Sequence, residues 1–111
     1  MTDIKRIVLF ASGSGSNAEN IIKFFASRED VKVVHLFSNK SDAFALERAK
    51  RNNVPTSVFS KEDFYNNGKV LNQLASLKCD LIVLAGFLWL VPASLVAAFP
   101  NRIINIHQIK L

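Results

Sequence analysis

Cysteine is almost absent from this sequence of 111 residues, in which Cys79 stands alone. A single cysteine excludes an internal disulfide and a cysteine metal cluster, so we expect Cys79 to be a small buried residue and the protein to hold no metal. Long hydrophobic runs are also missing, since the longest, residues 81–91, is far short of the roughly 20 residues that span a membrane. The first apolar stretch, residues 7–11, is too short for a secretory signal. We therefore expect a cytoplasmic protein with no membrane partner.

No block of like charge stands out, although the chain carries a net charge of +5. On charge alone, a nucleic-acid surface and a solvated helix face with affinity for a phosphorylated metabolite fit equally well. The sequence has no internal repeat, low-complexity tract or linker, and half of it is hydrophobic. We therefore expect residues 1–111 to form a single domain.

What the sequence does have is an alternation of strand-like and helix-like apolar patterns. We expect strands over residues 4–11, 31–37, 54–58, 81–85 and 102–107, and helices over residues 17–27, 42–51, 60–63 and 69–77 and from residue 92. This order predicts an α/β fold, a Rossmann-like parallel sheet with helices on both faces. Ligands of such sheets bind beyond the carboxyl ends of the strands.

Three local details accompany this assignment. Asn17 is suited to cap the first helix, and Glu47 can pair with Arg51 one helical turn later. Pro55 indicates an edge position for the third strand or a strand start. One side of the first helix is expected to carry its large apolar residues, Ile21, Ile22, Phe24 and Phe25.

The turn "ASGSGSN", residues 11–17, joins the first strand to the first helix. Glycines let the backbone approach a ligand, and free amides at a helix start favour an anion. The acid that would hold a dinucleotide's ribose is missing after the second strand, and there is no Gly-Lys-Ser/Thr for a nucleoside triphosphate. A single phosphate held by Gly15, Ser16 and Asn17 is therefore the better interpretation, weighed against a purely steric tight turn.

Two further segments follow strands at the same expected edge. After Ala85 and Gly86 come five large apolar residues, which predict either core under a helix or the wall of an aromatic, pterin-like ligand pocket. In the last strand, Asn105 and His107 point to one face, because strand side chains alternate. Asn can donate to a developing oxyanion and His can carry a proton near neutral pH, so this pair is a candidate catalytic site.

Taken together, "ASGSGSN", "FSNKSDAFALERAK", "DLIVLAGF" and "NIH", in this order and spacing, resemble the phosphoribosylglycinamide formyltransferase family of purine synthesis. The resemblance covers essentially the whole chain and implies a formyltransferase fold, amino-terminal part. Formyltetrahydrofolate deformylase and methionyl-tRNA formyltransferase share the "NIH" strand, and the Gly-Ser-Asn turn favours the first family over these.

The resemblance also implies an activity and a set of roles. The family transfers a formyl group from the cosubstrate 10-formyltetrahydrofolate to the amine of phosphoribosylglycinamide, which implies no nucleic-acid partner. Asn105 would steady the tetrahedral intermediate and contact the folate, and His107 would act in the stabilisation of that intermediate and in proton transfer. The phosphate would bind at Gly15, Ser16 and Asn17. The residues expected to line the folate pocket are Lys61, Leu88, Trp89, Leu90 and Val91, with Trp89 standing where the family often has arginine.

The resemblance stops after "NIH", because the family continues with Pro and a Leu-Leu-Pro segment where this chain has Gln108 and finishes at Leu111. In the family a catalytic Asp and further folate contacts follow. We therefore expect a truncated enzyme with little or no activity alone, or alternatively a ribonucleotide-binding module without catalysis. A dehydrogenase-like dinucleotide domain is the third hypothesis, disfavoured by the missing acid. An apolar sheet edge left uncovered predicts self-association.

Overall fold

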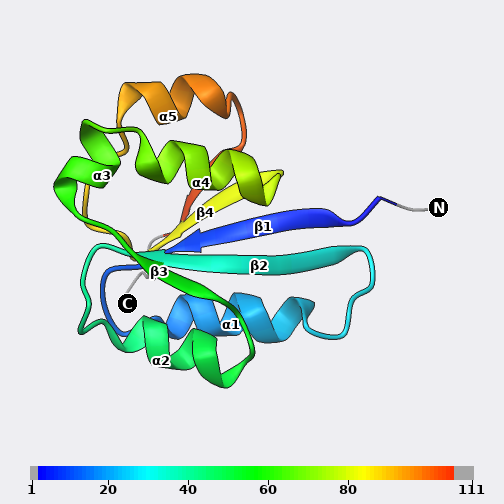
Figure 1. Cartoon of the computed structure of the whole chain (residues 1–111). Coiled ribbons are helices and arrows are strands. Elements are labelled where there is room, and N and C mark those ends of the chain that lie inside the picture. Colours follow the sequence, from blue (N-terminus) through cyan, green and yellow to red (C-terminus); the bar gives the residue numbers. More distant parts are fainter. Residues whose placement is uncertain (1–2, 107–111) are drawn as a thin grey trace.

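The computed structural model describes residues 3–106, which form one parallel five-stranded sheet with helices on both faces (Figure 1). The strand order is β3-β2-β1-β4-β5. The elements follow the chain as β1 (Lys5–Phe10), α1 (Ser16–Phe25), β2 (Val31–Ser38), α2 (Phe44–Arg51), β3 (Thr56–Val58), α3 (Lys61–Tyr65), α4 (Lys69–Leu77), β4 (Leu81–Ala85), α5 (Ala93–Ala98) and β5 (Ile103–Ile106). The predicted Rossmann-like α/β fold is confirmed.

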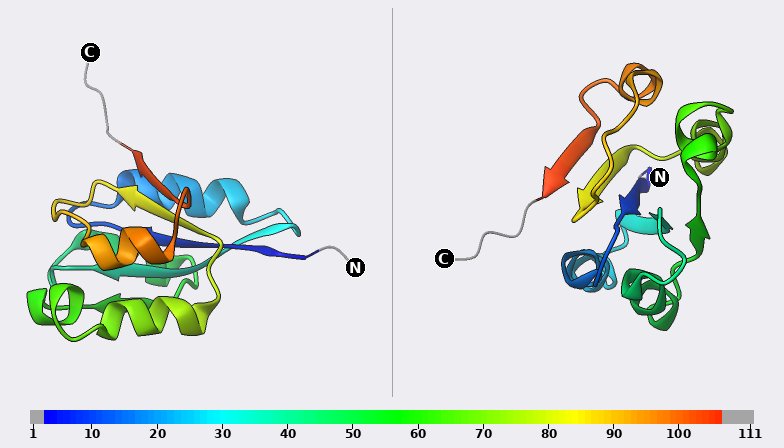
Figure 2. Two further views of the ribbon diagram at one scale, coloured as in Figure 1. Left: turned by 90° about the horizontal axis from the view of Figure 1, so that it is seen from above. Right: turned by 90° about the vertical axis from the view of Figure 1, so that its left-hand side faces the viewer.

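The sheet grows in both directions from its central strand β1, which pairs with β2 on one side and β4 on the other. Helices α1 and α2 cover one face, and α3, α4 and α5 cover the other (Figure 1). The third strand is an edge strand, as Pro55 indicated, and β5 forms the opposite edge (Figure 2). Because all the strands are parallel, the loops after β1 and β4 open at the same carboxyl edge. The strand order reverses between these two strands, which is where such α/β sheets bind ligands.

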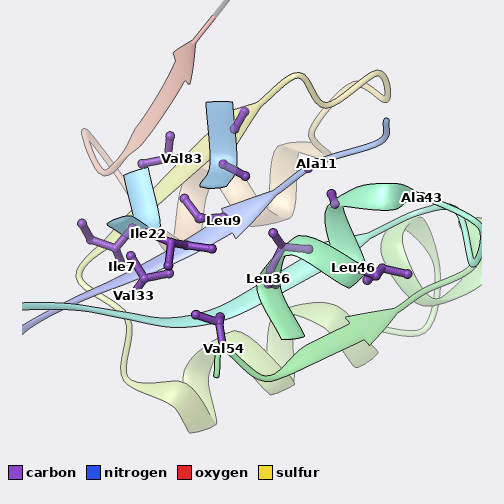
Figure 3. Packing of buried hydrophobic residues seen from close by; sticks show 14 residues of the cluster. Ile7, Leu9, Ala11, Ile22, Val33, Leu36, Ala43, Leu46, Val54 and Val83 are labelled. Carbon is purple, nitrogen blue, oxygen red and sulfur yellow. The ribbon is translucent and has the colours of Figure 1, made fainter. Parts of the chain in front are cut away.

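Each face of the sheet has its own hydrophobic core. Against α1 and α2, side chains such as Leu9 and Leu36 of the sheet meet Ile22 and Leu46 of the helices (Figure 3). The other core is aromatic, with Phe10 stacked on Phe37 at a centroid distance of 5.0 Å and surrounded by further rings. Both faces of β1 are therefore buried, which is why its sequence is continuously apolar rather than alternating.

The start of α1 differs from the prediction. The helix begins at Ser16, and its N-cap residue is Gly15 in the left-handed conformation with φ of 76°. Asn17 lies inside the first turn and is not the cap, so that prediction was wrong. The cap makes no side-chain hydrogen bond, and the consequence is that the first amides of α1 lack a capping partner.

Two side-chain predictions were also wrong. Phe24 is 67% exposed and lies outside the packed side of α1. It follows Ile22 by two residues, which in a helix turns its side chain by about 200° from that of Ile22. Arg51 does not pair with Glu47 and instead places its guanidinium 5.1 Å from the centroid of the Phe44 ring. Such a cation–π contact can replace an exposed ion pair, because an exposed ion pair contributes little stabilising free energy.

Candidate functional site

A pocket of about 160 Å³ opens at the carboxyl edge of the sheet. One wall is the glycine-containing turn of residues 13–17, and the other is made by Ala85, Gly86 and Ile106. Residues from the ends of β1, β4 and β5 therefore meet here, although they are distant in sequence. All three predicted phosphate-binding residues, Gly15, Ser16 and Asn17, line this one pocket.

Larger cavities lie at the opposite, amino edge of the sheet. Their volumes are about 460 and 430 Å³, and both are bordered by Phe25 and Val31. Neither contains any residue that the sequence predicted for the site. Size alone therefore does not identify the candidate site, since the smaller pocket is the one with free backbone amides and hydroxyls converging on it.

The turn has its shape because it lies directly against helix α2. The Ala45 N–H donates to the Gly13 carbonyl at 3.1 Å, and the Glu19 N–H donates to the Gly15 carbonyl at 2.8 Å. A Cβ placed on Gly15 would stand 2.5 Å from both Cα and Cβ of Ala45. Glycine is thus required at this position for two reasons, the left-handed backbone conformation and the close approach of α2.

Arg48 of α2 ties the turn to the body of the protein. Its Nε donates to the Ser14 carbonyl at 2.7 Å, and its Nη1 donates to the Glu19 carboxylate at 2.7 Å. The hydrogen bond from Arg48 holds the pKa of Glu19 below its usual value, with a smaller contribution in the same direction from Asn52. Sequence reasoning did not find this residue, because its partner Ser14 lies 34 positions away.

The apolar loop after β4 alternates between buried and exposed side chains. Phe87, Trp89 and Val91 pack against the aromatic core, whereas Leu88 and Leu90 are 72% and 85% exposed. The core interpretation is therefore confirmed for the inward side chains, and the interpretation as the wall of a ligand pocket stays a prediction. The inward side chains anchor the loop, and the side chains of Leu88 and Leu90 are left exposed.

Helix α3 brings a second predicted residue to this loop. Lys61 places its Nζ 5.8 Å from the centroid of the Trp89 ring. The helix start is fixed by a capping box in which Ser60 and Asp63 exchange hydrogen bonds. At its other end the hydroxyl of Tyr65 donates to the Leu90 carbonyl at 2.6 Å. Tyr65 was missed in the sequence, where nothing links it to a loop 25 residues later.

Strand β5 carries the remaining site residues. Asn105 pairs in register with Leu84, is exposed, and shares the sheet face of Ile103, which packs against the aromatic core. It therefore lies on the face that carries α3 and the apolar loop, whereas Ile106 lies on the opposite face and borders the turn. His107 lies outside the described residues.

No group of three or more His, Cys, Asp or Glu within residues 3–106 is placed to hold a metal ion. Cys79 is buried as expected, and burial raises the pKa of its thiol. No helix in the same range is long and apolar enough to cross a membrane.

The fold and the gathering of loops at the carboxyl edge define an α/β protein of the Rossmann-like class. Residues 5–109 match the family model described as Formyl transferase. The chain belongs to this family.

The chain is similar to proteins named as phosphoribosylglycinamide formyltransferases. One from Haemophilus influenzae is 37% identical over 94% of this chain, and a chloroplastic one from Arabidopsis thaliana is 37% identical over 96%. The crystal structure of one from Brucella melitensis superposes with a TM-score of 0.85 at 34% identity, covering 95% of this chain. The chain spans 51%, 39% and 57% of these three proteins, or about half of their length.

Proposed function

We propose that this chain forms part of an enzyme that transfers a formyl group from 10-formyltetrahydrofolate to the amine of phosphoribosylglycinamide in purine biosynthesis. The observation that carries the proposal is the pocket at residues 13–17, whose far wall is made by Ala85, Gly86 and Ile106. It sets a turn suited to phosphate beside Gly86 of the apolar loop and Ile106 of β5. The names of the relatives supply the substrate class.

The phosphate of the ribonucleotide would bind at the start of α1. Gly15, Ser16 and Asn17 border the pocket, and the first-turn amides have no intrahelical acceptor. The positive end of the helix dipole adds to the attraction of an anion. Among residues 3–106, no charged side chain lines this pocket, so these residues would hold the phosphate by neutral donors.

The folate would lie along the apolar loop on the other side of the carboxyl edge. The exposed side chains of Leu88 and Leu90 offer apolar contact, and the backbone at Trp89 and Val91 offers hydrogen bonds to a pterin. Lys61, beside Trp89, would attract the carboxylates of the folate tail. These roles rest on the placement of the residues and on the family match.

The chemistry would take place at the end of β5. The substrate amine attacks the formyl carbon, and the tetrahedral intermediate that forms carries a negatively charged oxygen. Asn105 is the side chain to donate a hydrogen bond to that oxygen. His107 is proposed to take the proton from the attacking amine and to pass a proton to the folate nitrogen, which leaves as a neutral amine when the tetrahedral intermediate collapses and the C–N bond to folate breaks.

A polypeptide limited to these 111 residues is proposed to bind the ribonucleotide and to show little or no formyl transfer. Its matched relatives are about twice as long, and the resemblance assigns a catalytic Asp and further folate contacts to the part beyond the match. A ribonucleotide-binding module without catalysis is the second candidate. It is favoured because the phosphate pocket is formed within the described residues, whereas Asn105 is exposed at a sheet edge.

Calorimetric titration with phosphoribosylglycinamide tests the phosphate assignment. We expect binding by the wild-type chain and affinity about tenfold weaker in Asn17→Ala. Asn72→Ala is a matched control, because Asn72 is exposed in another helix, α4, away from the pocket. Ribose 5-phosphate should compete and ribose should not. Absence of binding by the wild-type chain, or equal affinities in both variants, contradicts the assignment.

A further inference from the structure

Ser12 is a buried serine at the end of β1, with a relative exposure of 2%. Its hydroxyl donates to Oδ1 of Asn39 at 2.7 Å and accepts a hydrogen bond from the Leu88 N–H at 2.9 Å. Its own backbone N–H donates to the Gly86 carbonyl at 3.3 Å. One residue thus holds both the loop that follows β2 and the loop that follows β4.

Ser12 also connects the apolar loop to the candidate phosphate turn. It directly precedes the turn of residues 13–17, so the apolar loop is attached to the start of the candidate phosphate turn. A hydroxyl has one proton to donate, and here that proton goes to Asn39, which fixes the direction of the lone pairs that receive the Leu88 amide. Because the group is buried, a lost hydrogen bond is not readily replaced by water.

We propose that Ser12 is a positioning residue that sets the apolar loop, residues 86–91, against the phosphate turn. The inference rests on the proposed function, in which this loop binds the folate. It also restricts how the loop binds. The Leu88 N–H is occupied by Ser12, and the Leu90 carbonyl is occupied by Tyr65. The pterin must therefore use other backbone groups, of which those of Trp89 lie between the two attachments.

The loop contains its own reporter, because Trp89 is the only tryptophan in the sequence. Its fluorescence reports folate binding, and acrylamide quenching of the free protein reports how firmly the loop is held. The test compares Ser12→Ala, which removes both hydroxyl bonds, with Asn39→Ala, which removes only the acceptor. Ser76→Ala serves as the matched control, because Ser76 is exposed on α4 and its hydroxyl donates to the Asn72 carbonyl of the same helix.

We expect Ser12→Ala to weaken tetrahydrofolate binding about tenfold and to increase quenching of Trp89, with Asn39→Ala showing a smaller change in the same direction. Inorganic phosphate, measured by calorimetry, should bind Ser12→Ala within about threefold of wild type. The control should match wild type in every measurement. A purely structural serine would instead lower thermal stability while leaving the ratio of folate to phosphate affinity unchanged.

The outcomes separate this inference from the proposed function. Folate binding by wild type and by Ser12→Ala with equal affinity and equal quenching overturns the role of Ser12 and leaves the proposed function intact. Failure of wild type to bind tetrahydrofolate overturns the inference together with the folate assignment, and binding of phosphoribosylglycinamide then decides for the ribonucleotide-binding module. If Ser12→Ala does not fold, Asn39→Ala decides, and a folate affinity equal to that of wild type overturns the inference.

Discussion

Replacing Gly15 with alanine introduces a methyl group where helix α2 already lies. The new Cβ would meet Cα and Cβ of Ala45 at 2.5 Å, and Ala45 is completely buried. The contacted atoms belong to the backbone and to a side chain without rotamers, so neither can turn aside. The change also forces alanine into a left-handed conformation with φ of 76°.

The expected loss of stability has two parts. The left-handed backbone costs roughly 1–2 kcal/mol for a residue with a Cβ, and overpacking against a buried neighbour costs typically about 1–3 kcal/mol. Their sum, roughly 2–5 kcal/mol, is a large share of the 5–15 kcal/mol that stabilises a typical domain. The start of α1 would be displaced with the turn, and phosphoribosylglycinamide should bind at least about tenfold more weakly.

Gly68→Ala is the matched control for this substitution. Gly68 also precedes a helix, has a similar φ of 72°, and has nothing within 4 Å of the position of a Cβ. Both substitutions restrict the unfolded chain equally. The difference between their losses in the free energy of unfolding, measured by urea unfolding followed by circular dichroism, therefore reports the steric contact alone. We expect Gly15→Ala to lose about 1–3 kcal/mol more than Gly68→Ala. Equal losses would refute the argument that α2 and the turn are in contact.

Three further predictions concern other parts of the chain. Burial lowers the pKa of His35 below its ordinary 6.5, so the unfolded chain takes up a proton at a higher pH than the folded chain does. The urea concentration at the unfolding midpoint should therefore decrease as the pH is lowered from about 7.5 to about 5.5, and should decrease less in His35→Gln. Arg48→Lys removes the guanidinium whose Nε holds the Ser14 carbonyl and whose Nη1 holds Glu19. It should weaken phosphoribosylglycinamide binding about threefold to tenfold, whereas Arg51→Lys should not. Ile104 is 48% exposed on the edge strand β5, so the 111-residue polypeptide should self-associate in light scattering and Ile104→Lys should reduce this; equal masses would count against it.

The order of strands and helices could be predicted because each element carries a strong local pattern. Residues 81–85 are continuously apolar because β4 is covered on both faces, and Pro55 marks the edge strand. The start of α1 was harder to predict, because Asn17 is a good capping residue by type. What decides the start is the contact between Gly15 and Ala45, a tertiary constraint that local propensity does not contain.

The same distinction applies to the candidate site. The turn and the apolar loop could be recognised because glycine and large apolar residues at strand ends are unusual. The residues that hold them, Ser12, Arg48 and Tyr65, could not, since each acts through a hydrogen bond to a backbone group 25 or more positions away. A serine or arginine in that role looks like any other polar residue in the sequence.

We propose that the phosphorylated substrate binds at the turn at the carboxyl edge and not in the larger cavities at the amino edge. A titration of the isotopically labelled chain with phosphoribosylglycinamide, followed by amide chemical shifts, tests it directly. We predict the largest saturable shifts at Gly15, Ser16 and Asn17. Shifts concentrated around Ile22 and Val54, which line the amino-edge cavity of about 460 Å³, with none at the turn, would show that the substrate binds elsewhere.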